Sequence, residues 1–322
     1  MWDRITNFNL DQLPLLTASE QTKGSWAKEI ETPEMVPDLY KDFYKTRFNG
    51  DNVFPYSVIT PKFNGFLRQE NEKLICCQDN KIIVLENTNS QLIEFCYSIQ
   101  DINYVEAGSI LLKAWIRING ITDVGSSTST TLRFNTVTEY MFHPFVDQIR
   151  GAEDDFNQAG DDSELAKFDY LSEIDFKFMN YARKAISSGE QVVDHIFQPE
   201  IRAKILSILG KSLYRTISPS HISILTKRVL IIIKDTGSSS TNGNRRFGGI
   251  WLFIPLEKIN SGSIIEKDDD LLQLSLSMSA DEHIETLFSV SRKPEVDRLM
   301  KNLNALIPGQ NSAKVPINHN SF

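Results

Sequence analysis

The sequence contains an internal repeat, and this repeat limits the folds that the chain can adopt. His143–Arg150 and Lys293–Met300 share the pattern Pro-x-Val-Asp-polar-aliphatic at an offset of 150 residues. Two further pairs keep the same order: Lys81–Thr88 with Arg228–Asp235 at an offset of 147 residues, and Ile99–Asn103 with Leu256–Asn260 at an offset of 157 residues. A longer Gly-Ser-Asn loop before Arg245 accounts for the change in offset. Three matches in one order predict a duplicated domain.

Each copy has the residue pattern of several antiparallel strands followed by one helix. Short runs of β-branched and aromatic residues, separated by Asn, Asp and Gly turns, predict strands. The predicted strands are Leu74–Gln78, Lys81–Glu86, Gln91–Tyr97, Ile110–Ile118 and Thr130–Phe134 in the first copy, and Ile222–Leu225, Val229–Ile233, Gly249–Ile254 and Leu271–Met278 in the second. Pro144 and Pro294 suit the first turn of a helix, where no backbone N–H is needed. The predicted fold class is therefore mainly β with helices, a β-rich α+β fold.

The segments that flank the two copies have a different composition. Residues 1–62 contain five prolines among many aromatic residues, which predicts short helices and loops packed on the first copy. Apolar residues at spacings of three and four predict one amphipathic helix between the copies, formed by Leu165, Phe168, Leu171, Ile174, Phe178 and Tyr181. The predicted division is an N-terminal helical and loop extension (1–62), a first domain (63–151), an acidic linker with its helix (152–189), a second domain (190–306) and a flexible tail (307–322).

Length and composition agree with a folded, soluble protein. The 322 residues leave room for about two domains of ~150 residues each. Hydrophobic residues make up 41% of the chain and charged residues 24%, which is typical of globular proteins. The sequence has neither a run of about 18 apolar residues nor a secretory signal pattern, so the expected location is cytoplasmic. Three cysteines without metal-ligand spacing favour a reducing compartment.

The net charge of −8 conceals an uneven distribution of acidic and basic residues along the chain. Residues 151–175 contain nine acidic residues against Lys167 alone, and residues 201–249 contain nine basic residues against Asp235 alone. One interpretation is that both are solvated faces. The alternative is that the acidic segment lies over the basic region and competes with an outside anion. The overall acidity argues against a nucleic-acid partner.

The sequence lacks the common motifs for catalysis, metal binding or cofactor binding. The five histidines form no HExxH motif and no pair at helical ligand spacing. The glycine-rich segment Gly237–Gly249 is not followed by Lys-Ser or Lys-Thr, so it does not match a P-loop. Cys76 and Cys77 are adjacent on a predicted strand and point to opposite faces. We therefore expect a protein that is not an enzyme and has no catalytic residues, metal or cofactor.

One predicted hairpin resembles a known family. The sequence His221–Ile233, His-Ile-Ser-Ile-Leu-Thr-Lys-Arg-Val-Leu-Ile-Ile-Ile, is similar to the opening hairpin of bacterial pleckstrin-homology-like (PH-like) domains, in which a Leu-Thr-x-x-Arg-Leu turn joins the first strands. Leu74–Leu85 has the same hairpin pattern with Asp79 and Asn80 at its turn, without the Leu-Thr and the Arg. The resemblance covers about 73–150 and 190–306. It implies tandem PH-like domains, two barrels that are each capped by a C-terminal helix.

The basic residues around this hairpin are the candidate ligand-binding site. Lys227, Arg228, Lys234, Arg245 and Arg246 are predicted to surround one open end of the second barrel, where they could hold an anion or a lipid headgroup. The spacing from Lys234 to Arg245 and Arg246 resembles the phosphoinositide-binding pattern of PH domains, except that Phe247 occupies the place of the second arginine. The predicted function is a non-enzymatic binding or scaffolding module for a protein or peptide. The alternative is peripheral binding to anionic lipids at the inner face of the membrane.

Overall fold

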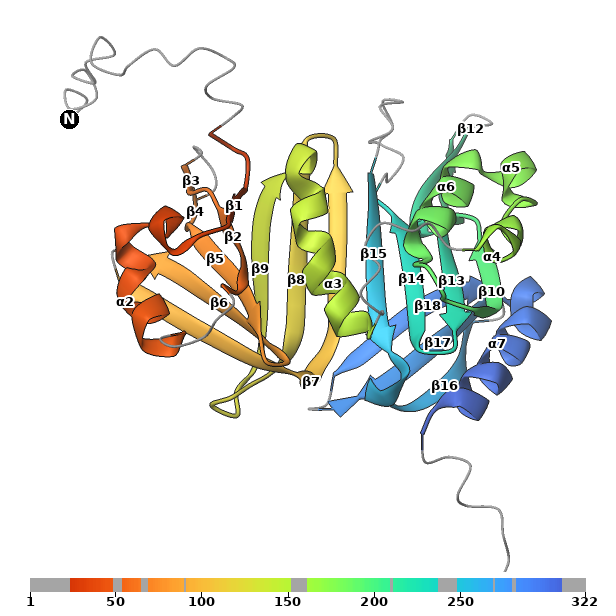
Figure 1. Cartoon of the computed structure of the whole chain (residues 1–322). Helices are drawn as coiled ribbons and strands as arrows, with labels where there is room; N and C mark the ends of the chain where they lie inside the picture. Colours follow the sequence, from red (N-terminus) through yellow and green to blue (C-terminus); the bar gives the residue numbers. More distant parts are fainter. Residues whose placement is uncertain are drawn as a thin grey trace, which may run out of the picture.

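A computed structural model describes most of the chain. The described residues are 24–48, 54–64, 69–89, 91–151, 161–208, 211–236, 248–268, 270–279 and 282–308. Antiparallel strands dominate these residues, and a few helices cover the sheets, so the predicted β-rich α+β fold class is confirmed (Figure 1). Most of the predicted loose tail and of the glycine-rich loop lies outside the described residues.

The first half of the chain contains strands, two short 3-10 helices and two α-helices. In chain order these are β1 (Lys28–Ile30), η2 (Pro33–Met35), α2 (Asp38–Arg47), β2 (Tyr56–Thr60), β3 (Phe63–Asn64), β4 (Gln69–Glu70), β5 (Lys73–Gln78), β6 (Lys81–Thr88), β7 (Gln91–Ile110), β8 (Lys113–Thr122), β9 (Ser127–Asn135), η3 (Thr136–Phe142) and α3 (His143–Arg150).

The second half begins with three short helices and ends with a longer one. Its elements are α4 (Asp162–Ala166), α5 (Leu171–Ile174), α6 (Phe176–Ala185), β10 (Val192–Gln198), β11 (Ile201–Ile208), β12 (Lys211–Ser218), β13 (His221–Thr226), β14 (Val229–Asp235), β15 (Gly248–Pro255), η4 (Leu256–Lys258), β16 (Ile259–Asp268), β17 (Leu271–Met278), β18 (His283–Ser289), η6 (Val290–Arg292) and α7 (Lys293–Leu306).

The long strand β7 joins the two halves into one sheet. Its first part pairs with β6, and its second part pairs with β8 on one side and with β15 on the other, from Val105 opposite Phe253 to Ile110 opposite Gly248. The strand bends between these parts, where its register with β8 shifts twice. Gly120 permits the bend, because a Cβ atom there would lie 2.5 Å from the carbonyl oxygen of Asp101. The resulting order is β1-β2-β5-β6-β7-β15-β14-β13-β10, with β8 and β9 branching from β7.

Neither half closes into the predicted barrel in the described part of the chain. The β7–β15 ladder uses a strand edge of the first half to pair with the second half, so the sheets remain open. The largest core is shared, since it contains Ile75, Ile118 and Ile149 of the first half together with Phe178 and Ile231 of the second. The expectation of two separate barrels is therefore wrong, because the halves share both a sheet and a core.

Helices and a small sheet cover the faces of this large sheet. Helix α3 contacts β7 and β15, and α6 contacts β13 and β14, on the side of the shared core (Figure 1). The opposite face of the second half packs on β16-β17-β18 and α7 through a second apolar cluster that includes Leu230, Leu274 and Leu299. A third cluster lies under α2 and includes Tyr40, Leu74 and Cys96.

The order of elements in the first half recurs in the second. In each half, the repeated series begins with one strand (β2 or β10), a hairpin (β3–β4 or β11–β12) and two paired strands (β5 and β6, or β13 and β14). The chain then passes from one sheet into another, within β7 in the first half and from β15 to β16 in the second. Two further strands (β8 and β9, or β17 and β18), a 3-10 helix (η3 or η6) and a terminal α-helix (α3 or α7) complete the series. The matched segments Ile99–Asn103 and Leu256–Asn260 both lie at the corner between two sheets. Where one unit ends and the next begins stays a prediction.

Two flanking segments differ from their predicted structure. Within 1–62, α2 is a helix as expected, but β1 and β2 are strands, and β2 pairs with β5 inside the large sheet. The predicted single helix between the halves is instead α4, α5 and α6. Asp175 interrupts it with an extended backbone, and its side chain accepts hydrogen bonds from the backbone N–H groups of Lys177 (3.1 Å) and Phe178 (3.3 Å). A side-chain cap of this kind starts a new helix.

A buried ion pair connects the end of α3 to the second half. Arg150 Nη2 lies 2.5 Å from Glu190 Oε2, and the two side chains are only 5% and 3% exposed. Arg150 also donates to the carbonyl oxygen of Ala185 (2.8 Å) and lies over the Phe253 ring at 4.4 Å. Glu190 accepts from the Thr226 hydroxyl at 3.2 Å. We call this contact between the end of α3 and the second half the joint. Within it, each charge is compensated by the opposite charge and by hydrogen bonds.

Breaking this ion pair should strongly destabilise the fold. Glu190→Gln leaves the Arg150 charge buried without its partner, which should lower the free energy of unfolding by about 3 kcal/mol or more. Glu295→Gln is the control, because the Arg292–Glu295 pair lies at the surface and should contribute at most about 1 kcal/mol. Urea unfolding measures both values. Equal effects of the two substitutions would contradict the role of the joint.

His221 is a buried histidine inside the second half. It is 1% exposed, its Nδ1 lies 3.1 Å from the carbonyl oxygen of Pro219, and its ring packs edge-on against Phe288. Its Nε2 has no hydrogen-bond partner among the described residues. Burial disfavours the charged imidazolium and lowers the pKa of His221 from 6.5 to about 4.

This histidine should make the fold sensitive to acid. Between pH 6.5 and about pH 4, the unfolded chain protonates at His221 and the folded chain does not, so about 3 kcal/mol of stability should be lost as the pH falls through this window. His221→Phe keeps a ring against Phe288 and removes the titration. Urea unfolding at a series of pH values should show the stability difference between variant and wild type changing by that amount. A constant difference would refute the prediction.

Candidate functional site

The structure separates the basic residues that the sequence analysis grouped together. Lys227 and Arg228 form the turn between β13 and β14, whereas Lys234 lies at the other end of β14. Six residues of extended chain span ~20 Å at ~3.3 Å per residue. The prediction that these cations surround one open end is therefore wrong, because the strand holds them apart. Arg245 and Arg246 lie outside the described residues.

Two of these cations make contacts within the fold. Arg228 Nη1 donates to the carbonyl oxygen of Gly151 at 2.7 Å, which ties the β13–β14 turn to the end of α3. Lys234 Nζ approaches the carbonyl oxygen of Glu285 at 3.5 Å, and desolvation lowers the pKa of Lys234. Lys227 is exposed. Two of the described acidic residues of 161–175 form ion pairs, Glu164 with Lys167 at 2.8 Å and Asp169 with Arg183. Neither of these described ion pairs involves a basic residue of 201–249.

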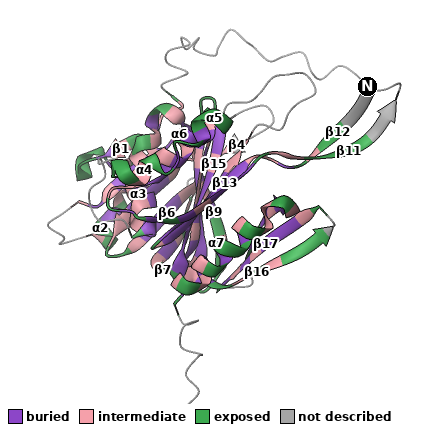
Figure 2. Ribbon diagram, turned by 90° about the vertical axis from the view of Figure 1, so that its right-hand side faces the viewer, coloured by how far each residue is buried: buried purple, intermediate pink, exposed green. Residues whose placement is uncertain are grey.

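A projecting β-ribbon carries another part of the predicted basic region. Strands β11 and β12 pair only with each other in the described residues, and they extend away from the body of the molecule (Figure 2). We call the described residues of this ribbon, 201–208 and 211–218, the arm. Its exposed residues include Arg202, Lys204 and Arg215, and its exposed apolar side chains include Ile205 (58%) and Tyr214 (55%).

The arm has an ordered base. Glu200 accepts from Arg202 Nε at 2.7 Å and from the Thr216 hydroxyl at 2.5 Å, so that one carboxylate connects both strands. The backbone N–H of Glu200 donates to the Ser220 hydroxyl at 2.9 Å. These contacts hold the two strands of the arm together at its base. The corresponding hairpin of the first half, β3–β4, has only two residues in each strand.

Side chains block two outer strand edges of the large sheet. At β10, the backbone N–H of Val192 donates to Glu164 Oε2 at 2.6 Å, and Lys167 Nζ donates to the carbonyl oxygen of Val192 at 2.8 Å. At β9, Lys73 Nζ donates to the carbonyl oxygen of Thr131 at 2.8 Å. An unblocked edge can pair with a strand from another chain. The arm keeps two long outer edges without a partner strand in the described structure.

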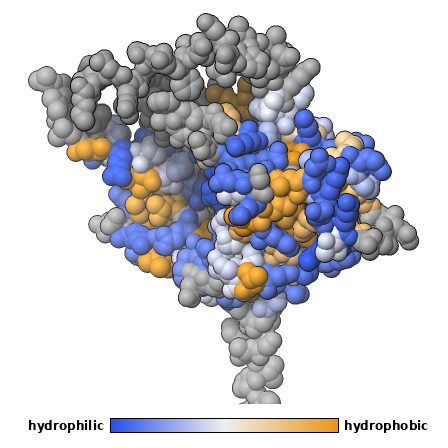
Figure 3. Space-filling view, turned by 90° about the vertical axis from the view of Figure 1, so that its left-hand side faces the viewer, coloured by the Kyte–Doolittle hydropathy of each residue, from blue (hydrophilic) through white to orange (hydrophobic). Residues whose placement is uncertain are grey.

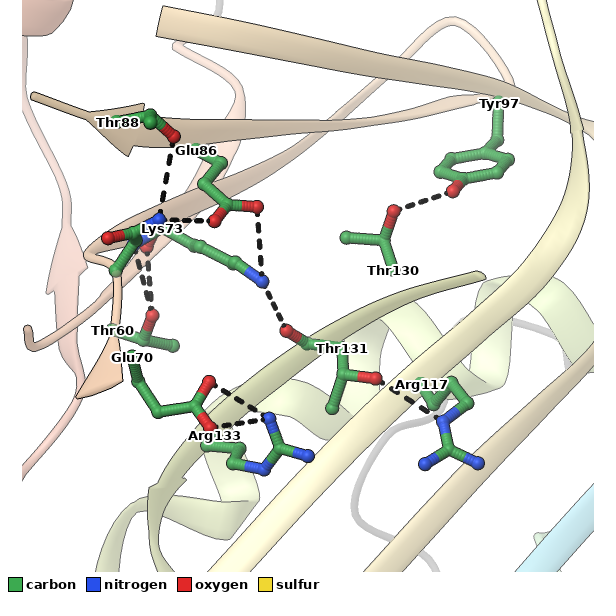
Figure 4. A network of polar contacts seen from close by, with 11 residues as sticks. Thr60, Glu70, Lys73, Glu86, Thr88, Tyr97, Arg117, Thr130, Thr131 and Arg133 are labelled. Atoms are coloured by element: carbon green, nitrogen blue, oxygen red, sulfur yellow. Dashed lines mark hydrogen bonds and ion pairs between the residues drawn. The ribbon is translucent and has the colours of Figure 1, made fainter. Parts of the chain in front are cut away.

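A polar network occupies the corner of the first half where β9 approaches β4 and β5 (Figure 4). Arg133 Nη1 binds both carboxylate oxygens of Glu70, at 2.8 and 2.9 Å. Lys73 Nζ lies 3.3 Å from Glu86 Oε2, and these side chains are 12% and 20% exposed. The Arg133–Glu70 pair connects β9 with β4, which form no backbone ladder with one another, whereas Lys73 and Glu86 lie opposite each other on the paired strands β5 and β6. The charged groups of the network compensate each other and are therefore structural.

Exposed apolar residues of the first half are scattered. Met35 and Phe63 are each 51% exposed, and Ile93 is 44% exposed. Figure 3 shows separate hydrophobic patches among hydrophilic residues on the face that carries α2. Such scattered residues are normal on protein surfaces. This face therefore does not point to one docking surface.

The turn between β7 and β8 is a more concentrated apolar feature. It consists of Leu111 and Leu112, which are 68% and 61% exposed. Leu111 has a φ of 55°, a left-handed conformation that costs a bulky residue about 1–2 kcal/mol. Thr136 holds the turn through two hydrogen bonds. Its hydroxyl donates to the carbonyl oxygen of Leu111 at 3.2 Å, and its backbone N–H donates to the carbonyl oxygen of Leu112 at 3.1 Å. The turn adjoins the start of β15, where Gly248 pairs with Ile110.

A polar pocket lies at the junction of the two halves. Its volume is ≈ 370 Å³, and it is lined by Asp79, Asn80, Lys81, Ser98, Ile99, Gln100, Gln148 and Glu257. Lys81 pairs with Asp123 at 2.6 Å, and Glu257 pairs with Lys258 at 3.1 Å. The pocket offers amide and hydroxyl groups for hydrogen bonds to a small polar molecule.

The described residues contain no cluster of three or more His, Cys, Asp or Glu side chains that could hold a metal ion. Cys76 is fully buried, and desolvation raises the pKa of its thiol. Burial and a hydrogen bond to Asp123 raise the pKa of Cys96 to about 11. A thiol is a weak nucleophile when its pKa is raised. Cys76 and Cys77 face different apolar clusters, as predicted for neighbours on one strand.

Two features of the site were missed by the sequence analysis. The arm falls within the basic segment 201–249, and a run of basic and apolar residues without acids was its signal. The Leu111–Leu112 turn was included in one long predicted strand, Ile110–Ile118, because leucine is not a typical turn residue. Neither feature could be recognised as exposed from local sequence, since exposure depends on which strands pair.

None of the described helices is long and apolar enough to cross a membrane. Comparisons of the sequence with protein-family models and with curated proteins found no match.

Proposed function

We propose that this chain is a non-enzymatic binding or scaffolding module that contacts a protein partner through the β11–β12 arm. The observation that carries the proposal is the ribbon itself, which projects from the body with exposed Ile205 and Tyr214 and with open outer edges. A two-stranded ribbon in water is only marginally stable by itself. Contact with a partner would cover its apolar side chains and its unpaired backbone groups.

The proposal treats the two halves as a tandem PH-like pair, although neither half closes, in the described residues, into the barrel that this resemblance implies. Each half has an ordered series of antiparallel strands that bend into a second sheet, followed by a terminal helix, α3 or α7. The hairpin β13–β14, from His221 to Asp235, has Leu-Thr-Lys-Arg at its turn, which is similar to the Leu-Thr-x-x-Arg turn of PH-like domains but places the arginine, Arg228, one position earlier. In this proposal the halves form a rigid platform in the cytoplasm, and the longer hairpin of the second half reaches the partner.

Photo-crosslinking tests whether the arm meets a protein in cells. With p-benzoylphenylalanine in place of Tyr214, irradiation should produce a covalent adduct with a protein. The control places the same amino acid at Phe63, which is 51% exposed in the β3–β4 hairpin of the first half and should give little adduct. Lys204→Glu with Arg215→Glu should reduce the adduct at position 214. Equal yields at both positions, or adducts with lipids alone, would contradict the proposal.

Peripheral binding to anionic membranes is the second candidate function. The observation that favours it is the apolar turn Leu111–Leu112, which is followed by the exposed Lys113. Lys234 lies at the end of β14 that leads into the segment containing Arg245 and Arg246. Apolar side chains that enter the interface and nearby cations can together hold a protein on an anionic leaflet. Lys227 and Arg228 belong to the other end of β14 and are less suited to this surface.

Vesicle co-sedimentation tests the membrane function. The full chain should sediment with phosphatidylcholine vesicles containing 30% phosphatidylserine at low salt, and less at physiological salt. Leu111→Ser with Leu112→Ser should weaken binding by at least about tenfold, because each buried leucine contributes about 1.5–3 kcal/mol. Arg245→Glu with Arg246→Glu should remove the salt-sensitive part. Neutral vesicles are the control, and failure to bind anionic vesicles at low salt would exclude this function.

A further inference from the structure

The internal repeat relates strand edges of the first half to strand edges of the second. The offset of 157 residues between Ile99–Asn103 and Leu256–Asn260 also relates the strands on both sides of this corner. Before the corner, it matches Gln91–Ser98 of β7 with the whole of β15. After the corner, it matches Tyr104–Ile110 of β7 with residues 261–267 of β16. An edge that is used in one half can therefore be compared with its counterpart in the other.

The chain uses one pair of these edges to join its own halves. The second part of β7 pairs with β15, through Val105–Ile110 and Gly248–Phe253. The counterpart of the second part of β7 is β16, which pairs with β17 alone in the described residues. The counterpart of β15 is the first part of β7, whose described residues 91–95 pair with β6 alone. We call Gln91–Phe95 the β7 edge and Ser263–Lys267 the β16 edge.

The register of the β7–β15 ladder predicts how the β7 edge and the β16 edge would pair. In this ladder, Ile250 lies opposite Gly108. The offset of 157 residues carries these two positions to Ile93 and Ile265. Both isoleucines are exposed, by 44% and 45%. Directly opposed residues of an antiparallel pair lie on one face with their Cβ atoms about 4.5–5.5 Å apart, so these two side chains would cover each other.

We propose that the β16 edge of one molecule pairs with the β7 edge of a second copy of this chain. A second copy is the partner because the chain carries both edges and already forms the equivalent ladder between its own halves. The two edges differ, so each contact leaves one edge of each kind free, and molecules add head to tail. This inference goes beyond the proposed function, since it uses neither the arm nor the Leu111–Leu112 turn.

The two edges lack the side-chain contacts that close other edges of the sheets. Lys73 donates to a backbone carbonyl of β9, and Glu164 and Lys167 occupy backbone groups of β10. Among the described residues, no side chain makes such a hydrogen bond to the backbone of either edge. The side chains of the β16 edge are largely exposed (Figure 2). An open edge of this kind can accept a strand from another chain.

The charged side chains of the two edges are compatible with this pairing. Lys267 would lie opposite the uncharged Gln91, on the face of the two isoleucines. On the other face, Glu94 would be a diagonal neighbour of Glu266 in the second molecule. The Glu266 carboxylate is already compensated, because Lys293 Nζ lies 3.2 Å from its Oε1. The repulsion between the two glutamates is thereby reduced.

The contact between molecules should be weaker than the internal ladder. It covers five residues of each edge instead of six, because the carbonyl oxygen of Cys96 already accepts a hydrogen bond from the backbone N–H of Asp123 at 2.9 Å. The ion pair of Arg150 with Glu190 is not repeated, because the offset of 150 residues places Met300 at the position of Arg150. Assembly should therefore be reversible and depend on protein concentration.

Sedimentation velocity over a concentration series tests the assembly of the full chain. Ile93→Lys and Ile265→Lys should each raise the dissociation constant at least about tenfold, because a charge replaces an apolar side chain that the pairing would bury. The matched control is Val137→Lys, which changes a 51% exposed side chain of η3 outside both edges and should leave the constant unchanged. Circular dichroism verifies that each variant folds. A wild-type chain that stays monomeric at all concentrations would overturn the proposal.

A mixture of the two edge variants gives the decisive result. The Ile93→Lys molecule keeps an intact β16 edge, and the Ile265→Lys molecule keeps an intact β7 edge. Each should be monomeric alone, whereas an equimolar mixture should form dimers of one molecule of each kind and no larger species. If Ile93→Lys dimerises by itself, β16 edges pair with each other, and the head-to-tail pairing is refuted. A mixture that stays monomeric would refute it as well.

Disulfide trapping tests the register. When Ile93→Cys and Ile265→Cys chains are mixed and oxidised, a covalent dimer should form. Glu266→Cys in place of Ile265→Cys is the control, since this neighbouring residue points to the opposite face and should give little dimer. The chain without new cysteines measures the background of the native thiols. Equal yields for the two mixtures would contradict the register. If the chain stays monomeric while p-benzoylphenylalanine at position 214 still gives a protein adduct, this inference fails and the proposed function stands.

Discussion

The antiparallel pairing of β7 with β15 is the constraint on which the rest of the structure depends. Residues Val105–Ile110 pair with Phe253–Gly248, so the second sheet of the first half continues into the first sheet of the second half. Buried backbone groups must find hydrogen-bond partners, and this ladder satisfies them across the joint. As a consequence, the two halves cannot close separately and share their largest core.

The buried Arg150–Glu190 pair lies at the same joint and makes it specific. A buried charge is tolerated when an opposite charge and hydrogen bonds compensate it, and here Ala185, Thr226 and the Phe253 ring complete the surroundings. The C-terminal end of α3 can therefore occupy one position relative to the second half. Elsewhere in the second half, Glu200 joins the two strands of the β11–β12 arm at its base.

The surface features proposed for binding are exposed, whereas many other charged side chains make contacts within the fold. Lys73, Glu86, Arg133 and Glu70 connect strands in the first half, and Glu164 and Lys167 block the edge of β10. These groups are engaged within the fold. The arm and the Leu111–Leu112 turn combine exposure with apolar side chains, which favours contact with another molecule. Both candidate functions rest on this contrast.

The amino-acid sequence by itself determined the hairpins β5–β6 and β13–β14, the strands β15 and β17, and the terminal helices α3 and α7, because these depend on local periodicity and turn residues. Pro144 at the start of α3 and Gly151 at its end, with a φ of 65°, are examples. The sequence did not predict the strands β1, β2, β10, β11, β12, β16 and β18. Only the tertiary structure decided that β7 pairs with β15, that β14 separates Lys227 and Arg228 from Lys234, and that Asp175 divides the expected helix. Long-range pairing depends on which distant edges meet, and a local pattern does not contain that information.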